Sequence, residues 1–376
     1  MDASVAEKLA ELIKIYRLKG ELVNYDSLKS GNINDTYTVV TDYGGSERQY
    51  IIQRINLNVF KKPLDVAANI ASVTQHIESK LKEAGVSDLR RRVVKFYKTP
   101  DGDYYHYDSD GSCWRVSSFV FNSVTHDSAD NTELLCSVGT AFGEFQKFLC
   151  DFDASKLFIT IPDFHNTEKR VADMISAAKA DPFGRLNSVK SEYDYLISES
   201  GRAKMFRELN EKGEIPVRVT HNDTKCNNVM FDSATNRHLA VIDLDTVMPG
   251  FAAHDFGDAV RFAANPGGED ADDVSEVFLD LGRYAAFAKG YVTQIRGFLT
   301  EKELLTLPDG VAVITLELAA RFLTDYLLGD VYFKCKKENH NLIRTRAQTA
   351  LLKDIIAKMP LMRTELNKII ANCANN

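Results

Sequence analysis

The first part of the chain opens with a helical pattern and continues with runs typical of strands. Residues 4–18 repeat apolar side chains at helical spacing, and Gly20 ends the pattern. Segments 21–28, 36–41 and 49–55 are rich in Val, Ile, Thr and Tyr, and the polar stretches SGNIND and DYGGSE separate them. The pattern predicts an N-terminal helix followed by three strands joined by turns.

A long amphipathic helix is expected directly after the third strand, at residues 64–84. Further strand-like runs lie at 92–99, 103–108 and 113–121, and an Asp-Gly turn signal stands in each gap between them. The first 120 residues are therefore predicted to form a mainly antiparallel sheet with one long helix inserted after the third strand.

After Asn122 the pattern becomes mostly helical. Helical periodicity is present at 130–150, 167–179, 189–212, 271–297, 301–306, 310–328 and 341–372. One β-rich insert interrupts these helices, VRVTHNDTKCNNVMFD and then HLAVIDLD. The expected fold class is α+β, with a small antiparallel-sheet N-lobe at 1–122 and a larger, mainly helical C-lobe at 123–376.

Composition narrows the possible partners and the compartment. The 376 residues carry a formal net charge of −7, which disfavours sequence-independent nucleic-acid binding. The six cysteines are scattered and form no metal or disulfide pattern. The first twenty residues do not resemble a signal peptide, and no apolar stretch is long enough for a membrane span. A cytoplasmic protein without membrane or nucleic-acid partners is expected, and the sequence does not indicate whether it has protein partners.

The candidate chemistry lies in the β-rich insert, between His221 and Asp245. The string HNDTKCNN places Asp223 five residues before Asn228, and VIDLD later places Asp243 and Asp245 at the end of an apolar strand. Phosphoryl transfer needs a carboxylate to accept or orient the attacking hydroxyl, and oxygen ligands for Mg²⁺. The pattern meets both needs.

A plainer interpretation is that these are solvated loop residues, since Asn and Asp are common in turns. That interpretation suits any one of them better than it suits the compound pattern HxD-x4-N followed by DxD. For His221, anchoring the loop through hydrogen bonds is favoured over direct acid–base work.

HNDTKCNN followed by VIDLD resembles the signature of the aminoglycoside phosphotransferase and choline kinase superfamily, whose members are related to protein kinases. The resemblance implies a two-lobed protein-kinase-like fold, with ATP and Mg²⁺ as cofactors. It also implies that Asp223 is the catalytic base and contacts the acceptor. Asn228 and Asp243 are then the Mg²⁺ ligands, and Asp245 is a further ligand that also borders the acceptor.

A narrower resemblance points to the N-acetylhexosamine 1-kinase branch, whose members phosphorylate the anomeric hydroxyl of N-acetylglucosamine or N-acetylgalactosamine. The strings that carry it are GNINDTY (31–37), YIIQRIN (50–56), NVFKKP (58–63), WRVSSFV (114–120), IPDFHNTEKR (161–170), THNDTKCNNVMFD (220–232), VIDLDTVMPG (241–250), HDFGD (254–258) and RFLTDYLLGDVYF (321–333).

The turn between the first two strands is the expected cover of the nucleotide phosphates. Backbone groups there can cradle phosphate, which makes Asn32 and Thr36 candidate nucleotide contacts. Asn34 and Asp35 carry side chains able to bond a sugar hydroxyl. The choice between phosphate and sugar stays open, and so does an ordinary hairpin turn.

The third strand departs from the wider family, which places Lys or Arg where this chain has Gln53. Either Gln53 binds phosphate by neutral hydrogen bonds, or a bulge brings Arg54 inward from the opposite face, or Arg54 forms a salt bridge. Ser118 and Val120 lie in the strand that would become the hinge beside adenine, where core packing is the alternative.

Later residues complete the predicted site. Asp255 and its neighbour Asp258, in HDFGD, resemble the family's structural acids after the metal loop, and they are expected to brace the backbone rather than bind metal because enough metal ligands lie upstream. The family resemblance places Arg321 and Tyr332 at the acceptor, whereas an i, i+4 salt bridge from Arg321 to Asp325 is the plainer alternative. Two rival functions remain: a kinase of another small alcohol (choline, a hexose or an aminoglycoside), and a catalytically inactive kinase-like binding module.

Overall fold

The computed structural model describes residues 3–28, 33–129 and 131–374. The chain divides into two structural units. The sheet unit comprises Met1–Val124, Ser155–Pro162 and Met230–Met248, and the helical unit comprises Thr125–Ala154, Asp163–Val229 and Pro249–Asn376. Each unit is described by itself below.

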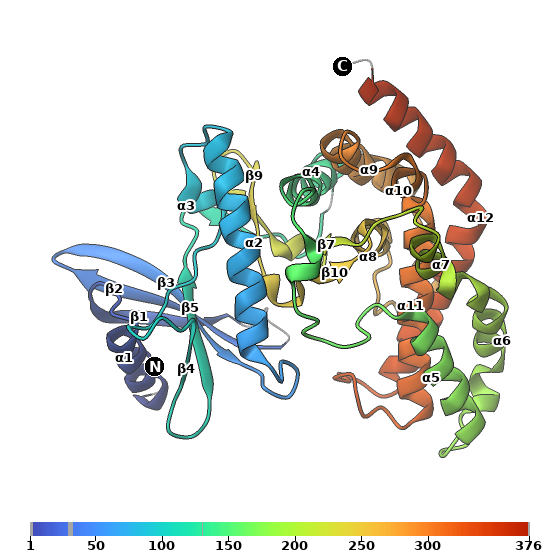
Figure 1. Cartoon of the computed structure of the whole chain (residues 1–376). Helices are drawn as coiled ribbons and strands as arrows, with labels where there is room; N and C mark the ends of the chain where they lie inside the picture. Colours follow the sequence, from blue (N-terminus) through green and yellow to red (C-terminus); the bar gives the residue numbers. More distant parts are fainter. Residues whose placement is uncertain (1–2, 29–32, 130, 375–376) are drawn as a thin grey trace. The chain divides into compact units, whose positions relative to one another are not determined.

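The sheet unit is built on a five-stranded antiparallel sheet (Figure 1). Its strand order is β1-β2-β3-β5-β4. The strands are β1 (Glu21–Leu28), β2 (Asp35–Tyr43), β3 (Ser46–Ile55), β4 (Tyr105–Tyr107) and β5 (Cys113–Ser118). The β2–β3 and β3–β5 pairings are in continuous register, so side chains directly opposite each other share a face wherever these strands pair.

Two helices cover opposite faces of this sheet. Helix α1 (Ala3–Ile15) packs Leu9 and Leu12 against Ile52 and Trp114, and this cluster is fully apolar at its centre. Helix α2 (Pro63–Glu83) brings Ala67 and Ile70 to the face that carries Arg115 and Tyr105. Because side chains alternate along a strand, Ile52 faces α1 while Gln53 and Arg115 lie on the α2 face.

The other segments of the sheet unit are tied to it by polar contacts. A three-stranded sheet has the order β6-β8-β9, with β6 (Ser123–Val124), β8 (Val229–Asp232) and β9 (His238–Val241). The guanidinium of Arg91, in α3 (Leu89–Arg92), donates to Asp232 at 2.6 Å. The Asn69 amide of α2 donates to the carbonyls of Phe158 and Val247 at 2.8 and 3.0 Å. The turn that follows β9 is thereby tied to α2.

The helical unit consists mainly of α-helices, with one pair of short strands. These strands are β7 (Arg218–Thr220) and β10 (Met248–Gly250). The helices are α4 (Thr132–Phe148), α5 (Thr167–Ala180), α6 (Lys190–Glu199), α7 (Met205–Glu211), α8 (Ala252–Ala263), α9 (Leu281–Ile295), α10 (Glu301–Leu305), α11 (Leu307–Leu327) and α12 (His340–Ala374). The predicted α+β class, with an antiparallel-sheet region followed by a helical region, is confirmed.

The structure differs from the sequence-based prediction at several places. Residues 92–99 form one isolated bridge, between Phe96 and Ser117, instead of a strand. The helix expected at 189–212 is broken into α6 and α7 by a 3-10 turn. The helix expected from 271 begins only at Leu281, because the Asp280 side chain caps it by accepting from the N–H of Arg283. Helix α8 was not predicted.

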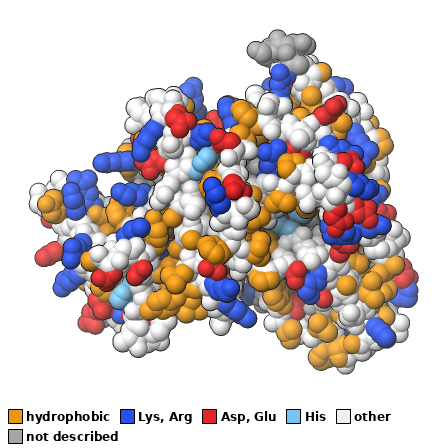
Figure 2. Space-filling model, viewed as in Figure 1, with side chains coloured by type: hydrophobic (Ala, Val, Ile, Leu, Met, Phe, Trp, Pro, Cys, Tyr) orange, Lys and Arg blue, Asp and Glu red, His pale blue; other side chains and the backbone are white. Residues whose placement is uncertain are grey.

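Charged side chains of both signs are interspersed over the face shown in Figure 2. This distribution agrees with a modest net charge of −7. Among the helices in the described part of the chain, none is both long and apolar enough to span a membrane.

Close packing of α4 on α9 depends on glycine. A Cβ added to Gly290 would lie 2.0 Å from the carbonyl oxygen of Cys136, and one added to Gly139 would lie 2.2 Å from that of Phe287. Both contacts are with backbone, which cannot move aside without separating the helices. The sequence positions of these glycines therefore set the distance between α4 and α9.

We predict that Gly290→Ala lowers the free energy of unfolding by about 2 kcal/mol or more, because the added methyl group overpacks a helix–helix contact. Urea denaturation of the purified protein measures this. Gly201→Ala is the matched control, since an added Cβ there meets nothing within 4 Å; its effect is expected to stay within about 0.5 kcal/mol. Equal stabilities of the two variants would contradict the packing account.

Candidate active site

The loop His221–Asn228 follows β7 and carries the first group of predicted site residues. Asn222 adopts a left-handed backbone conformation with φ of 65°. Asn tolerates this region better than most residues, and such outliers concentrate at functional sites. A 3-10 turn at Cys226–Asn228 then closes the loop and leads into β8. The loop is thus held in a defined, non-extended shape.

A buried carboxylate on α8 fixes the start of this loop. Asp255 accepts the backbone N–H groups of His221 and Asn222, each at 2.8 Å, and the side-chain amide of Gln146 at 3.0 Å. Burial raises the pKa of Asp255, although the His221 ring and the two backbone N–H groups act in the opposite direction. The predicted bracing role of Asp255 agrees with these contacts, because its oxygens are occupied by the loop backbone.

The ring of His221 is completely buried. Its Nδ1 accepts the backbone N–H of Asp223 at 3.2 Å. The edges of Phe142 and Phe145, both on α4, pack against the ring with centroids 5.6 and 5.7 Å away. These contacts suit an anchor for the loop, as the sequence suggested.

Two neighbours in the loop hold the carboxylate of Asp223. Asn228 Nδ2 donates to the Asp223 carbonyl at 2.8 Å and to its Oδ2 at 3.2 Å. The ammonium of Lys225 lies 2.7 Å from Oδ1. Burial lowers the pKa of Lys225, but the charge of Asp223 and the hydrogen bond to it outweigh burial, so the net pKa is raised. Lys225 therefore stays cationic beside the predicted base.

A second acid on α8 supports the middle of the loop. Asp258 accepts the backbone N–H of Thr224 at 3.1 Å and the guanidinium of Arg261 at 3.0 Å. Burial acts to raise the pKa of Asp258, and the nearby charges of Arg261 and Lys225 more than compensate, so the net pKa is lowered. Asp258 contacts backbone and a cation, as a bracing residue would.

The DxD pair lies in the sheet unit, in the turn after β9. Asp243 adopts the left-handed conformation with φ of 59°, and a 3-10 turn at Leu244–Thr246 follows. Asp245 is only 4% exposed. Its carboxylate is paired with both terminal nitrogens of Arg115, and Oδ2 also accepts from Asn34 Nδ2 at 2.8 Å.

Arg115 belongs to a row of polar side chains across the α2 face of the sheet. Thr36 stands opposite Gln53, and Gln53 stands opposite Arg115. Gln53 donates to the Thr36 hydroxyl at 3.0 Å and accepts from Arg115 Nε at 2.8 Å. Burial works against the charge of Arg115, yet Asp245 and Tyr105 outweigh it, and the pKa of Arg115 is raised.

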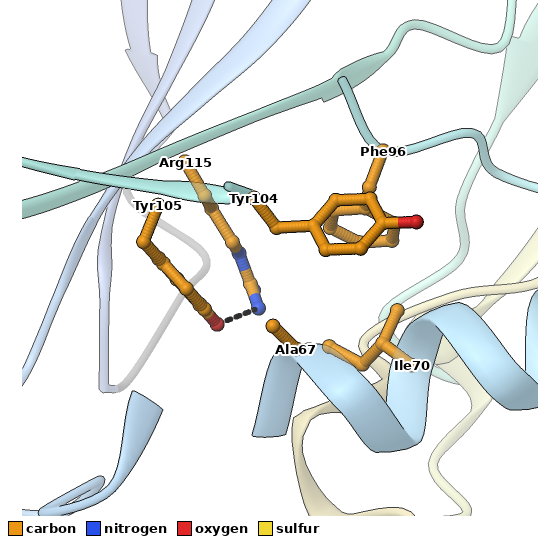
Figure 3. Close-up of a pocket in the computed structure, with 6 residues that line it drawn as sticks. All are labelled: Ala67, Ile70, Phe96, Tyr104, Tyr105 and Arg115. Carbon is orange, nitrogen blue, oxygen red and sulfur yellow. Dashed lines mark hydrogen bonds between the residues drawn. The ribbon is translucent and has the colours of Figure 1, made fainter. Parts of the chain in front are cut away.

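Figure 3 shows Arg115 and Tyr105 side by side, pointing toward α2. The guanidinium lies over the ring of Phe96, 5.3 Å from its centroid, and donates to the Tyr105 hydroxyl at 3.4 Å. Burial raises the pKa of Tyr105 to about 12. The small pocket here is lined by Ala67, Ile70, Phe96, Tyr104, Tyr105 and Arg115.

The strand register excludes one of the alternatives left open at Gln53 and Arg54, while phosphate binding by Gln53 stays a prediction. No shift interrupts β2–β3 or β3–β5 at these residues, so no bulge turns Arg54 inward. Arg54 is half exposed and pairs with Asp35, which is the salt-bridge alternative. Asn32, the remaining predicted nucleotide contact in the turn, lies outside the described residues.

The expected adenine-side residues already make bonds within the sheet unit. The backbone N–H of Ser118 donates to the Lys95 carbonyl at 2.8 Å, and its hydroxyl accepts the N–H of Lys95 at 3.0 Å. Val120 is buried, and its carbonyl accepts from the Ser123 hydroxyl. Nucleotide contact at these two residues stays a prediction.

The end of α11 carries the predicted acceptor residues. Asp325 accepts the backbone N–H groups of Val331, Tyr332 and Phe333 at 2.8–2.9 Å. The guanidinium of Arg321 lies over the rings of Tyr332 and Phe333, 5.9 and 5.3 Å from their centroids. Asp325 thus organises the turn after the helix, and Arg321 stacks on aromatic rings.

The donor chemistry of the predicted ligands fits magnesium. Asn228 and Asp243 offer hard amide and carboxylate oxygens, and Mg²⁺ uses one or two such protein ligands beside water and phosphate. Within the described residues, no three His, Cys, Asp or Glu side chains gather as a metal site. A site that relies on few protein ligands is compatible with that finding.

Two residues of these sites were not singled out from the sequence. Lys225 stands two positions after Asp223, inside the recognised motif, and its spacing was a usable signal. Arg115 lies in the strand expected to become the hinge, and no site role was predicted for it. Its role follows from cross-strand register, which a single sequence does not reveal.

The fold is shared with several solved kinases and phosphotransferases. An aminoglycoside phosphotransferase from Alicyclobacillus acidocaldarius subsp. acidocaldarius superposes with a TM-score of 0.60 at 13% identity, covering 95% of each chain. A choline kinase from Cryptosporidium parvum gives 0.56 at 12% identity, covering 98% of this chain and 99% of that one. A spectinomycin phosphotransferase gives 0.53 at 11% identity, with 92% and 97% covered.

The sequence itself matches the model of the phosphotransferase enzyme family, APH, over residues 25–287. The match spans more than half of the chain, so the chain belongs to this family. Membership establishes a phosphotransferase with the kinase-like fold.

We predict that Lys225→Met lowers the rate of phosphoryl transfer by about 100-fold, because a misplaced reacting group costs a factor of this order. Release of nucleoside diphosphate under saturating substrate measures the rate. Lys204→Met is the matched control, since Lys204 makes an exposed helical ion pair with Glu208. Wild-type turnover in Lys225→Met would show that the Lys225–Asp223 contact has no part in the reaction.

Proposed function

We propose that this phosphotransferase transfers the γ-phosphoryl group of ATP to the anomeric C1 hydroxyl of N-acetylglucosamine or N-acetylgalactosamine, giving the sugar 1-phosphate. The observation that carries the reaction type is the Asp223 carboxylate, held between Asn228 and Lys225 on a braced loop. The acceptor rests on the sequence resemblance and on the surroundings of Arg321.

In the proposed reaction the C1 hydroxyl oxygen attacks the γ-phosphorus in line with the leaving oxygen. A new O–P bond forms, the bond from the γ-phosphorus to the bridging oxygen breaks, and ADP leaves with that electron pair. Asp223 accepts the hydroxyl proton. The partial exposure of its side chain, 28%, lets an acceptor reach it.

Asn228 and Asp243 would hold Mg²⁺, which neutralises charge on the phosphates when bound. The Nδ2 of Asn228 already donates to Asp223, so its Oδ1 is the atom suited to a cation. One contact would thus fix both the predicted base and a predicted ligand.

The nucleotide is proposed from the fold neighbours and from the sheet unit. The spectinomycin phosphotransferase was solved with ADP and spectinomycin. An aminoglycoside 2′-phosphotransferase of the same fold, with a TM-score of 0.52, was solved with GDP. The choice of adenine is therefore part of the proposal, with Thr36, Gln53, Ser118 and Val120 as the candidate contacts.

The charges around Arg321 favour a neutral acceptor over a cationic one. Tyr332 and Phe333 already carry a guanidinium over their rings, and its charge would repel a choline ammonium at the same place. The nearby acids are also occupied. Asp325 accepts backbone N–H groups, and Asp330 pairs with Arg185 at 2.6 Å. An aminoglycoside, which is polycationic, would need unpaired acids.

The sheet-unit residues predicted to meet the sugar are less suited to it. Asn34 donates to Asp245 and accepts the N–H of Asn56 at 3.0 Å, and Asp35 pairs with Arg54. Their side chains would have to exchange these bonds for sugar hydroxyls. Arg321 and Tyr332 are therefore the main acceptor candidates.

The test is an acceptor panel with the wild-type enzyme, with ATP or GTP, with Mg²⁺ or with a chelator. We expect kcat/KM for the two N-acetylhexosamines to exceed that for choline by about 10⁴-fold, because a site built for sugar hydroxyls leaves polar groups unpaired around the wrong acceptor. Glucose, galactose and an aminoglycoside complete the panel. Phosphorus NMR of the product should place the phosphate on C1.

The matched control is the 1-deoxy analogue of N-acetylglucosamine, which keeps every hydroxyl except the proposed nucleophile. No turnover is expected with it. Phosphorylation of the analogue would show that another hydroxyl reacts. Preference for choline or an aminoglycoside would support the other small-alcohol kinases, and no turnover with any acceptor would support a binding module.

A further inference from the structure

The surroundings of Asp245, the second acid of the DxD pair, differ from those of a metal ligand. Both of its carboxylate oxygens face Arg115, with Nη2 2.9 Å from Oδ2 and Nη1 paired with Oδ1. Asn34 adds a third donor, at 2.8 Å. Lone pairs remain on the two oxygens, but a guanidinium fixed beside them repels a divalent cation.

The guanidinium of Arg115 is equally committed. Nε donates to Gln53, Nη1 donates to Tyr105 as well as to Asp245, and the flat group is covered by the ring of Phe96. Arg115 is 3% exposed. A bidentate Arg–carboxylate pair with its other donors satisfied is the arrangement in which a buried ion pair holds its geometry.

Moving Asp245 out to bind a cation would leave Arg115 as an unpaired buried charge, which is strongly destabilising. The same pair also restrains Asp243, because Asp243 stands only two residues before Asp245 in the same turn. Asp243 has a left-handed backbone conformation that few non-glycine residues adopt. Such a conformation persists only when its surroundings impose it.

We propose that Asp245 is a positioning residue rather than a metal ligand, and that the Arg115–Asp245 pair fixes the turn that presents Asp243. Gln53 orients Arg115 from the neighbouring strand, and Asn34 ties the start of β2 to the same carboxylate. The cation that fixes this face of the sheet is thus on β5, opposite Gln53. The proposal rests on the proposed function in one respect, the assignment of Mg²⁺ to Asp243.

The test is a double-mutant cycle of Arg115→Met, Asp245→Asn and the double variant, read out as the Mg²⁺ dependence of ADP binding by calorimetry. Each single change is expected to lower the affinity for Mg²⁺ by about 10-fold, which is the lower end of the loss seen when a partner of a metal ligand is removed. The double variant should lose the same factor and not the product, because both changes break one pair. Urea midpoints of the metal-free proteins should show the same non-additivity.

A direct ligand role for Asp245 predicts that Arg115→Met does not lower the affinity for Mg²⁺. If Asp245 bound the metal directly, removing the cation beside it would raise the affinity for Mg²⁺ or leave it unchanged. Either result with Arg115→Met overturns the proposal. Arg54→Met is the matched control on the neighbouring strand, with no change expected. Should Arg115→Met fail to fold, Arg115→Lys serves, since an ammonium cannot reproduce the bidentate contact. With this variant, weaker Mg²⁺ binding supports the proposal, and unchanged or tighter Mg²⁺ binding overturns it.

Failure of the proposed function is distinguishable, because no acceptor is present in these experiments. A wrong acceptor leaves every readout intact. Wild-type ADP binding that does not depend on Mg²⁺ would overturn the assignment of Asp243 and the positioning role together. Mg²⁺-dependent wild-type binding with an unchanged Arg115→Met variant would overturn the positioning role alone.

Discussion

The conformation of the loop His221–Asn228, which carries the predicted base, depends on one buried carboxylate, that of Asp255. Two consecutive backbone N–H groups and one side-chain amide converge on it inside the helical unit. Burying a carboxylate is costly unless its oxygens are hydrogen-bonded, and here the loop supplies the donors. The carboxylate and the loop conformation therefore stabilise each other. Asp223 stands one residue beyond the second of these N–H groups, so its direction is set by this contact.

The supporting elements of the loop are themselves held at close range. Helix α4 supplies Gln146 and the two Phe rings around His221, and glycine at the α4–α9 contact allows the helices to approach closely. Helix α8 supplies Asp255 and Asp258. In the sheet unit a buried ion pair has the corresponding role, since Arg115 holds the carboxylate of Asp245 in the turn after β9. Each unit thus fixes its own part of the predicted chemistry.

Most of the fold could be predicted from the sequence because apolar periodicity reports burial directly. Helix α1 and strands β1–β3 follow that rule and were found within a few residues. Helix α8 was missed although His254, Asp255, Asp258 and Arg261 recur at helical spacing, because the string HDFGD was interpreted as a motif and not as the polar face of a helix. The misplaced strand at 92–99 has strand-like composition but only one bridge, because pairing depends on a partner that composition does not show.

The candidate site divides in the same way. Asp223, Asn228 and Asp243 could be singled out because they lie in a compound motif with fixed spacing, and Asp255 because the string HDFGD resembles the family's structural acids. The inward position of Gln53 and the outward position of Arg54 followed from strand alternation. Arg115 could not be found so, because its partners Gln53 and Asp245 are 62 and 130 residues away along the chain. Contacts over such separations are set by register and by turns.

The central claim is that Asp223 acts in the chemical step and not in nucleotide binding. Rapid-quench single-turnover experiments with Asp223→Asn, together with calorimetry of Mg²⁺–ADP binding, test it most directly. The account predicts that the rate of phosphoryl transfer falls by about 10³-fold or more, within the range for a lost general base. ADP affinity should change by less than about 3-fold, since the base makes no predicted contact with the nucleotide. Transfer at the wild-type rate would contradict the account.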